Sequence, residues 1–104
     1  MRQITIDAIR AFRNNYPFKR SNTQVICYGN THFKETMIKE LRLFNNVIAV
    51  CDVWGNLYIT DAGHQSVTTK ERLNGLPNVH IVQKNFVWYL NGEAWNGDLI
   101  KVEW

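Results

Sequence analysis

Turn-forming residues divide this sequence into short segments. Asparagine occurs twelve times among the 104 residues, often in pairs or directly before glycine. Asn and Gly tolerate the positive φ angles that tight turns require, while the intervals between them are rich in β-branched and aromatic residues that favour strands. The pattern leaves no room for long helices and predicts short elements joined by tight turns.

The length of the chain limits it to one domain with a modest core. Hydrophobic residues make up 45% of the sequence and charged residues 20%. This balance excludes a disordered tail, and no segment is long and apolar enough to span a membrane. We therefore expect a single globular domain over residues 1–104 and no membrane partner.

A first helix is predicted over residues 5–14. Thr5 is a suitable N-cap, and Asp7 would place a carboxylate in the first turn. Ile6, Ile9 and Phe12 fall on one stripe, which we expect to face the core. The paired asparagines at 14 and 15 end the helix.

A second short helix is predicted over residues 69–75. Thr68 and Glu71 have the spacing of a capping box, in which each side chain bonds the backbone N–H of the other residue. Asn74 and Gly75 supply the C-terminal cap, and Pro77 prevents continuation.

The remaining apolar segments are predicted as strands. Residues 35–44 fit either a helical stripe that includes Met37 or the first strand of a hairpin, and the turn signal at Asn45 and Asn46 favours the hairpin. The predicted strands are 23–28, 41–44, 47–53, 57–60, 79–83, 86–90 and a last strand from residue 100 onward. The sequence therefore predicts an α+β fold with a largely antiparallel sheet of about six to seven short strands and two short helices.

The cysteine and histidine spacing predicts no metal site. Cys27 and Cys51 lie in apolar runs 24 positions apart, and the three histidines are isolated from them. We expect two reduced, buried thiols in a cytosolic protein, without a metal or cofactor.

No enzyme motif is present. The sequence lacks a dinucleotide fingerprint, a P-loop, a nucleophile elbow and a metalloprotease motif. Asp61 and His64, three positions apart, are the pair that could form an unfamiliar catalytic site, but a solvated polar turn explains them more simply. We expect no catalytic residue.

The net charge of +3 is unevenly distributed. Residues 1–34 carry +5, and the rest of the chain carries −2. Arg10 and Arg13 share one side of the first predicted helix, and Lys19 and Arg20 lie in a predicted turn that follows it. Aromatic residues are interleaved with these charges as far as Phe33 and Lys34, a pattern compatible with phosphate contacts and base stacking. A solvated helix face is the simpler interpretation.

Four tryptophans exceed what a small core needs. Trp88 lies within a predicted strand and is assigned to the core. Trp54 and Trp95 lie at predicted turns and are the candidates for exposed anchors of a protein interface, unless they fold back over the core.

Two stretches of the sequence resemble a family of small accessory proteins from tailed bacteriophages. They are residues 67–92, with the run Val67-Thr68-Thr69-Lys70-Glu71-Arg72-Leu73-Asn74-Gly75-Leu76-Pro77, and residues 17–25. The resemblance implies an origin and a shared scaffold, and it carries no catalytic residue over to this chain. Residues 29–36 and 52–56 are the least similar, and such loops are where specificity for a partner would lie.

These observations predict a non-catalytic phage accessory protein that binds and inhibits a host bacterial protein in the cytoplasm of the infected cell. Arg10, Arg13, Lys19, Arg20, Trp54 and Trp95 are its expected partner-binding residues. The alternative is a nucleic-acid-binding module that uses the N-terminal basic face. A homodimer is compatible with either, because exposed sheet edges are often covered by a second copy.

Overall fold

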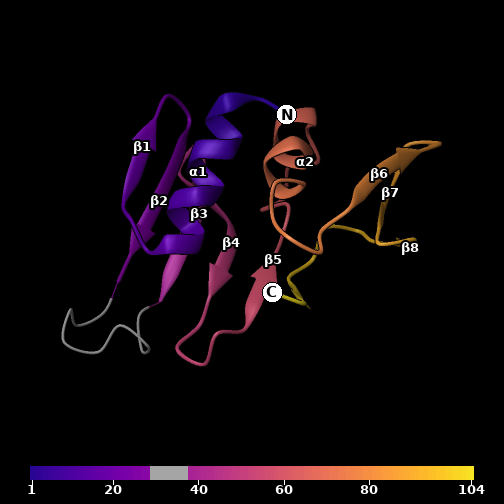
Figure 1. The fold of residues 1–104 in the computed structure, drawn as a ribbon. Coiled ribbons are helices and arrows are strands. Elements are labelled where there is room, and N and C mark those ends of the chain that lie inside the picture. The colour runs from indigo at the N-terminus through magenta and orange to yellow at the C-terminus, as the bar shows by residue number, and fades with distance from the viewer. Residues whose placement is uncertain (29–37) are drawn as a thin grey trace.

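The computed structural model describes residues 1–28 and 38–104 (Figure 1). The helices are α1 (Gln3–Asn14) and α2 (Val67–Leu73). The strands are β1 (Phe18–Arg20), β2 (Thr23–Cys27), β3 (Lys39–Leu43), β4 (Asn46–Cys51), β5 (Leu57–Ile59), β6 (Ile81–Lys84), β7 (Val87–Leu90), β8 (Glu93–Ala94) and β9 (Ile100–Val102).

The strands form two antiparallel sheets. The larger sheet has the order β1-β2-β3-β4-β5-β9, and α1 lies across one of its faces (Figure 1). The smaller sheet, β6-β7-β8, projects away from the body and is called the arm, residues 81–94. The predicted α+β class and its antiparallel sheet are confirmed, with the strands divided between a main sheet and the arm.

Two hairpin turns are shifted by one residue from their predicted positions. The turn between β3 and β4 is Phe44-Asn45, with φ angles of 51° and 66°, and the turn between β6 and β7 is Asn85-Phe86, with φ angles of 53° and 67°. Two consecutive positive φ angles match the right-handed twist of the flanking strands. From Lys39 onward the hairpin prediction is confirmed and the helical alternative is wrong; Met37 lies outside the described residues.

Helix α1 starts earlier than predicted. Arg2 is the N-cap, and Thr5, predicted as the cap, is fully buried inside the helix. Ile9 and Phe12 are buried as predicted, whereas Ile6 is exposed and Thr5 and Ala8 complete the buried face. The helix ends as predicted, with Asn15 in the left-handed conformation at φ 63°.

Helix α2 is capped by Ser66, so the predicted capping box of Thr68 and Glu71 is wrong. The Ser66 hydroxyl accepts a hydrogen bond of 3.0 Å from the backbone N–H of Thr69. With Ser66 as the cap, Thr69 rather than Glu71 lies at the third helical position, and Glu71 Oε1 bonds Arg72 and Thr5 instead. The helix ends at Asn74 as predicted, and that side chain bonds both the N–H and the carbonyl of Ile81 at the start of the arm.

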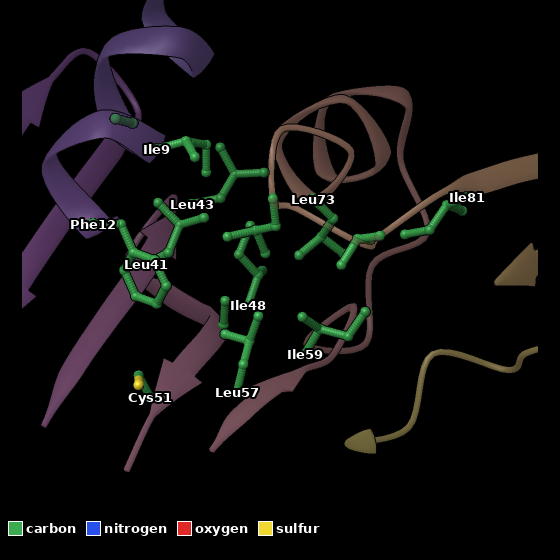
Figure 2. Close-up of a cluster of buried hydrophobic side chains, with 14 of the residues drawn as sticks. Ile9, Phe12, Leu41, Leu43, Ile48, Cys51, Leu57, Ile59, Leu73 and Ile81 are labelled. Atoms are coloured by element: carbon green, nitrogen blue, oxygen red, sulfur yellow. The ribbon is translucent and has the colours of Figure 1, made fainter. Parts of the chain in front are cut away.

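Both sheets and both helices contribute to one hydrophobic core. Figure 2 shows Ile9 and Phe12 of α1 facing Leu41 and Leu43 of the main sheet, while Leu73 of α2 lies on the other side of the cluster. The core also includes residues of the arm and its flanking segments: Val79, Ile81, Trp88, Leu90 and Trp95. The arm is therefore fixed to the body through its buried face.

Arg72 is the polar centre of this packing. Its side chain is only 1% exposed, yet its guanidinium donates to the hydroxyls of Thr5 at 2.9 Å and Thr23 at 3.0 Å and pairs with Glu71. One side chain of α2 thus bonds residues of α1 and β2. The segment that follows α2 also packs tightly against α1. A Cβ atom at Gly75 would lie only 2.7 Å from Thr5 Cγ2.

We predict that Arg72→Leu lowers the free energy of unfolding by about 3–5 kcal/mol, because it leaves buried partners of the guanidinium without donors. Urea denaturation measures the change. Arg72→Lys should also lose stability, since an ammonium cannot reproduce the guanidinium fork. Arg13→Leu on the exposed side of α1 is the control and should change stability by less than about 0.5 kcal/mol. A similar small effect of Arg72→Leu would contradict the prediction.

Candidate functional site

Two of the predicted basic residues meet at Asp7. Arg20 Nη1 lies 2.8 Å from Asp7 Oδ2, and Arg10 Nη1 lies 4.0 Å from Asp7 Oδ1. The hydrogen bond from Arg20, with one from Gln3, lowers the pKa of the Asp7 carboxyl. Asp7 therefore neutralises part of the charge predicted for this face.

The predicted four-charge patch is divided between two faces. Residues 18–20 form strand β1 rather than a turn, so Lys19 points to the opposite face of the sheet from Arg20. Arg13 remains on α1 and lines a shallow hollow of about 520 Å³ together with Arg10 and Ile6. Only Arg10, Arg13 and Arg20 are left on the helix side of the sheet.

The two candidate tryptophans differ in exposure. Trp54 is 82% exposed in the loop between β4 and β5, where Asp52 accepts hydrogen bonds from the backbone N–H groups of Trp54 and Asn56. Trp95 is only 8% exposed, packs against Trp88 and donates its indole N–H to the carbonyl of Asp98. The prediction that Trp95 is an exposed anchor is wrong, because it folds back over the core. Trp88 lies in the core as predicted.

The sequence reasoning missed Phe86, the most exposed large hydrophobic residue among those described. Phe86 is 93% exposed at the tip of the arm, with a φ angle of 67°. A bulky residue in the left-handed region costs on the order of 1–3 kcal/mol. Phe44 is similar, at 65% exposure and φ 51° in the β3–β4 turn. Placing the β3–β4 turn one residue earlier and the β6–β7 turn one residue later would have revealed both.

The arm has one buried face and one partly exposed apolar face. Trp88 and Leu90 are buried. The strand register places Val82 opposite Tyr89, and Tyr89 opposite Ala94, on the other face. Val82 is 43% exposed, and Val87, which lies on the same side, is 41% exposed. Lys84, opposite Val87, shares this outer face, so Val87 is the apolar residue of the face that lies next to Phe86 in the turn.

Asp61 and His64 both line a pocket of about 330 Å³ with apolar walls that include Leu43 and Ile48. The Asp61 carboxylate accepts a hydrogen bond from the backbone N–H of Gly63, and His64 donates its backbone N–H to the Asp61 carbonyl. Among the described residues, no hydrogen bond joins the carboxylate to the imidazole. The Asp61 carboxylate instead packs against the backbone of Gly97.

A buried lysine lies between the two cysteines. Strand register places Lys39 directly between Cys27 and Cys51, so the Cα atoms of the two cysteines are two strand spacings apart, about 9–10 Å. That separation exceeds the roughly 7 Å limit between Cα atoms for a disulfide, and both thiols are free as predicted. Cys51 is buried, whereas Cys27 is only half-buried.

The Lys39 ammonium is held without a carboxylate partner among the described residues. Its Nζ lies 5.0 Å from the ring centroids of both Phe12 and Trp104 and 3.1 Å from Asn15 Oδ1. Burial lowers the pKa of Lys39. Burial likewise raises the pKa of both neighbouring thiols.

Residues 1–28 and 38–104 contain neither a metal-binding cluster nor a membrane-spanning helix. No group of three or more His, Cys, Asp or Glu side chains is arranged to hold a metal ion there. No helix in these ranges is long and apolar enough to cross a membrane. The predicted specificity loop at residues 29–36, with Phe33 and Lys34, lies outside the described residues.

The fold and surface describe a small α+β protein with a projecting apolar arm. The family model of the Kyanoviridae Gp96 protein matches residues 1–104, and the chain belongs to this family of bacteriophage proteins. The predicted phage origin is therefore confirmed. No curated protein and no solved structure matches the chain.

We predict that Lys39 makes stability rise with pH on the alkaline side. Its pKa is lowered from 10.5 in the folded state, so between the two pKa values the unfolded chain binds more protons and raising the pH favours folding. Lys39→Met removes this contribution. The unfolding free energy of the wild type minus that of Lys39→Met should therefore increase as the pH approaches 10.5.

Urea denaturation from pH 7 upward, in the presence of a reductant, measures this difference. Both proteins also carry Cys27→Ser and Cys51→Ala, because the Lys39 ammonium acts on the pKa of both thiols and their titration would otherwise differ between the two proteins. A difference that stays constant with pH would contradict the lowered pKa of Lys39.

Proposed function

We propose that this phage protein binds and inhibits a host bacterial protein, in the cytoplasm of the infected cell, by docking its arm. The proposed anchor is Phe86 at the arm tip, flanked by Val82 and Val87 on the outer face. The carrying observation is that Phe86 combines 93% exposure with a strained backbone.

The strain supports a role in binding. Glycine is the usual residue at this position of the turn, and it would adopt the observed φ of 67° without penalty. A phenylalanine here lowers the stability of the free protein and exposes an aromatic side chain to water. Strained, exposed residues of this kind concentrate at functional sites, and aromatic anchors dominate many interfaces.

The way the arm is built also supports docking. Its inner face is packed into the core through Trp88, which contacts Trp95, and its strands project from the body (Figure 1). A rigid projection loses little conformational entropy when it enters a groove of a partner. Occupying that groove would block whatever the host protein ordinarily binds there, which is the proposed mode of inhibition. The proposal involves no catalysis and no cofactor.

Nucleic-acid binding through the N-terminal face is the competing function. It is favoured by the hollow that Arg10 and Arg13 line together on α1. It is weakened by the salt bridge between Arg20 and Asp7 and by the position of Lys19 on the other face. Phosphate contacts would make such binding strongly salt-dependent, and it would not respond to changes in the arm.

We predict that Phe86→Gly stabilises the protein while removing its binding partner. Relieving the strained φ should raise the free energy of unfolding by about 1 kcal/mol. Loss of the anchor should lower the amount of host protein captured at least tenfold. Urea denaturation and quantitative pull-down from nuclease-treated host lysate measure the two effects.

Phe44→Gly is the matched control, because it relieves the same kind of strain at an exposed phenylalanine in the other hairpin turn. It should raise stability less than Phe86→Gly, because Phe44 also loses contacts at the rim of the 330 Å³ pocket, and it should leave capture unchanged. Equal capture by wild type and Phe86→Gly would refute the arm as the docking element. Capture that disappears on nuclease treatment, or with Arg10→Glu and Arg13→Glu, would favour the nucleic-acid function instead.

A further inference from the structure

Strand β9 is an edge strand beside an open groove. Within those residues it pairs only with β5, so the hydrogen-bonding groups of its other edge are not used in the sheet. Ile100 is 40% exposed, and the preceding Leu99 is 63% exposed. An exposed apolar edge of this kind is a template for another strand.

The groove has a shape suited to an extended peptide. One wall is β9 (Ile100–Val102) with the following Glu103, and the other is the base of the arm, with Leu90, Asn91 and Glu93. Its volume is about 1100 Å³. Pockets for small molecules are typically about 300–1,000 Å³ and more enclosed, so this open trough exceeds what a small ligand requires.

The arm wall is held in place by a network around Asn91. Its side chain accepts from the backbone N–H of His80 at 2.9 Å and donates to the carbonyl of Asn78 at 3.0 Å. Asn78 in turn donates to the carbonyl of Trp104 at 3.4 Å, which joins the arm side of the groove to the segment after β9. A groove fixed in this way needs little reorganisation before a peptide enters it.

The charges of the groove favour a basic occupant. Glu93 and Glu103 contribute two carboxylates, one from each wall, against the single ammonium of Lys101. In the strand register Lys101 stands opposite Tyr58 of β5, and its side chain lies on the other face of β9 from Ile100 and Val102. A strand in the groove would therefore meet apolar side chains on one side and a net negative charge at the walls.

We propose that the groove between β9 and the arm binds an extended, basic segment of a protein by strand addition to β9. Backbone hydrogen bonds to the free edge of β9 would supply sequence-independent affinity. Apolar side chains of the segment would contact Ile100 and Leu90, and Lys or Arg side chains would pair with Glu93 and Glu103. The inference rests on the proposed function, because the segment that enters the groove belongs to the host protein that the arm binds.

The experiment uses an acetylated octapeptide of alternating valine and lysine residues, added to the full chain. Amide hydrogen exchange followed by NMR reports on residues 99–103. We expect peptide binding to slow exchange at outward-facing amides of β9 at least tenfold. A control peptide with proline in place of each valine cannot form the strand ladder and should give no protection.

Charge and anchor variants separate this site from the arm tip. Glu93→Lys combined with Glu103→Lys should weaken peptide binding at least tenfold, because the groove becomes positive. Phe86→Gly should bind the peptide like the wild type, since the arm tip does not line the groove. Failure of this inference and failure of the proposed function therefore give different results.

Three outcomes would overturn the inference. The first is no protection of β9 at any peptide concentration up to millimolar. The second is peptide binding without slower exchange in residues 99–103. The third is protection of β9 that depends on protein concentration in the absence of peptide, which would mean that a second copy of the chain covers this edge.

Discussion

The buried guanidinium of Arg72 is the constraint on which the rest of the structure depends. A charge that is 1% exposed is tolerated only when its donors are satisfied, and Thr5, Thr23 and Glu71 supply the acceptors. These partners fix α2 against α1 and β2 at the same time. The same contacts explain why Thr5 is inside helix α1 rather than at its cap, and why Glu71 takes no part in capping α2.

The position of the arm follows from this arrangement. Asn74, at the end of α2, bonds both backbone groups of Ile81, so the first residue of β6 is placed relative to the helix that Arg72 holds. Trp88 and Trp95 then bury the inner face of the arm in the common core. The arm can bury only one of its two faces against the core, so the outer face and Phe86 stay exposed. The projecting surface is thus a consequence of how the core is closed.

Sequence patterns predicted the elements better than their contacts. The α+β class, the β3-β4-β5 meander and the burial of Trp88 follow from turn residues and alternation, which are local properties. The capping box and the exposure of Trp95 could not be settled locally, because they depend on Arg72 and on packing between Trp88 and Trp95. The basic patch failed for a related reason: a three-residue strand, β1, sends Lys19 and Arg20 to opposite faces. Phe86 was missed because a one-residue shift decides whether Asn85 begins or ends its turn.

The two strained turns have the same backbone geometry but different surroundings, and this difference decides which of them is the better candidate for binding. Phe44 lies at the rim of the 330 Å³ pocket beside α2, where neighbouring apolar walls account for part of its contacts. Phe86 is 93% exposed at the far end of the arm and gains less from its own chain. Contacts within the folded protein therefore explain part of why a phenylalanine is tolerated at position 44. They explain very little of why one is present at position 86. A strained aromatic residue with so few internal contacts is best explained by a contact outside the chain, which is why the arm, rather than the basic helix, carries the functional argument.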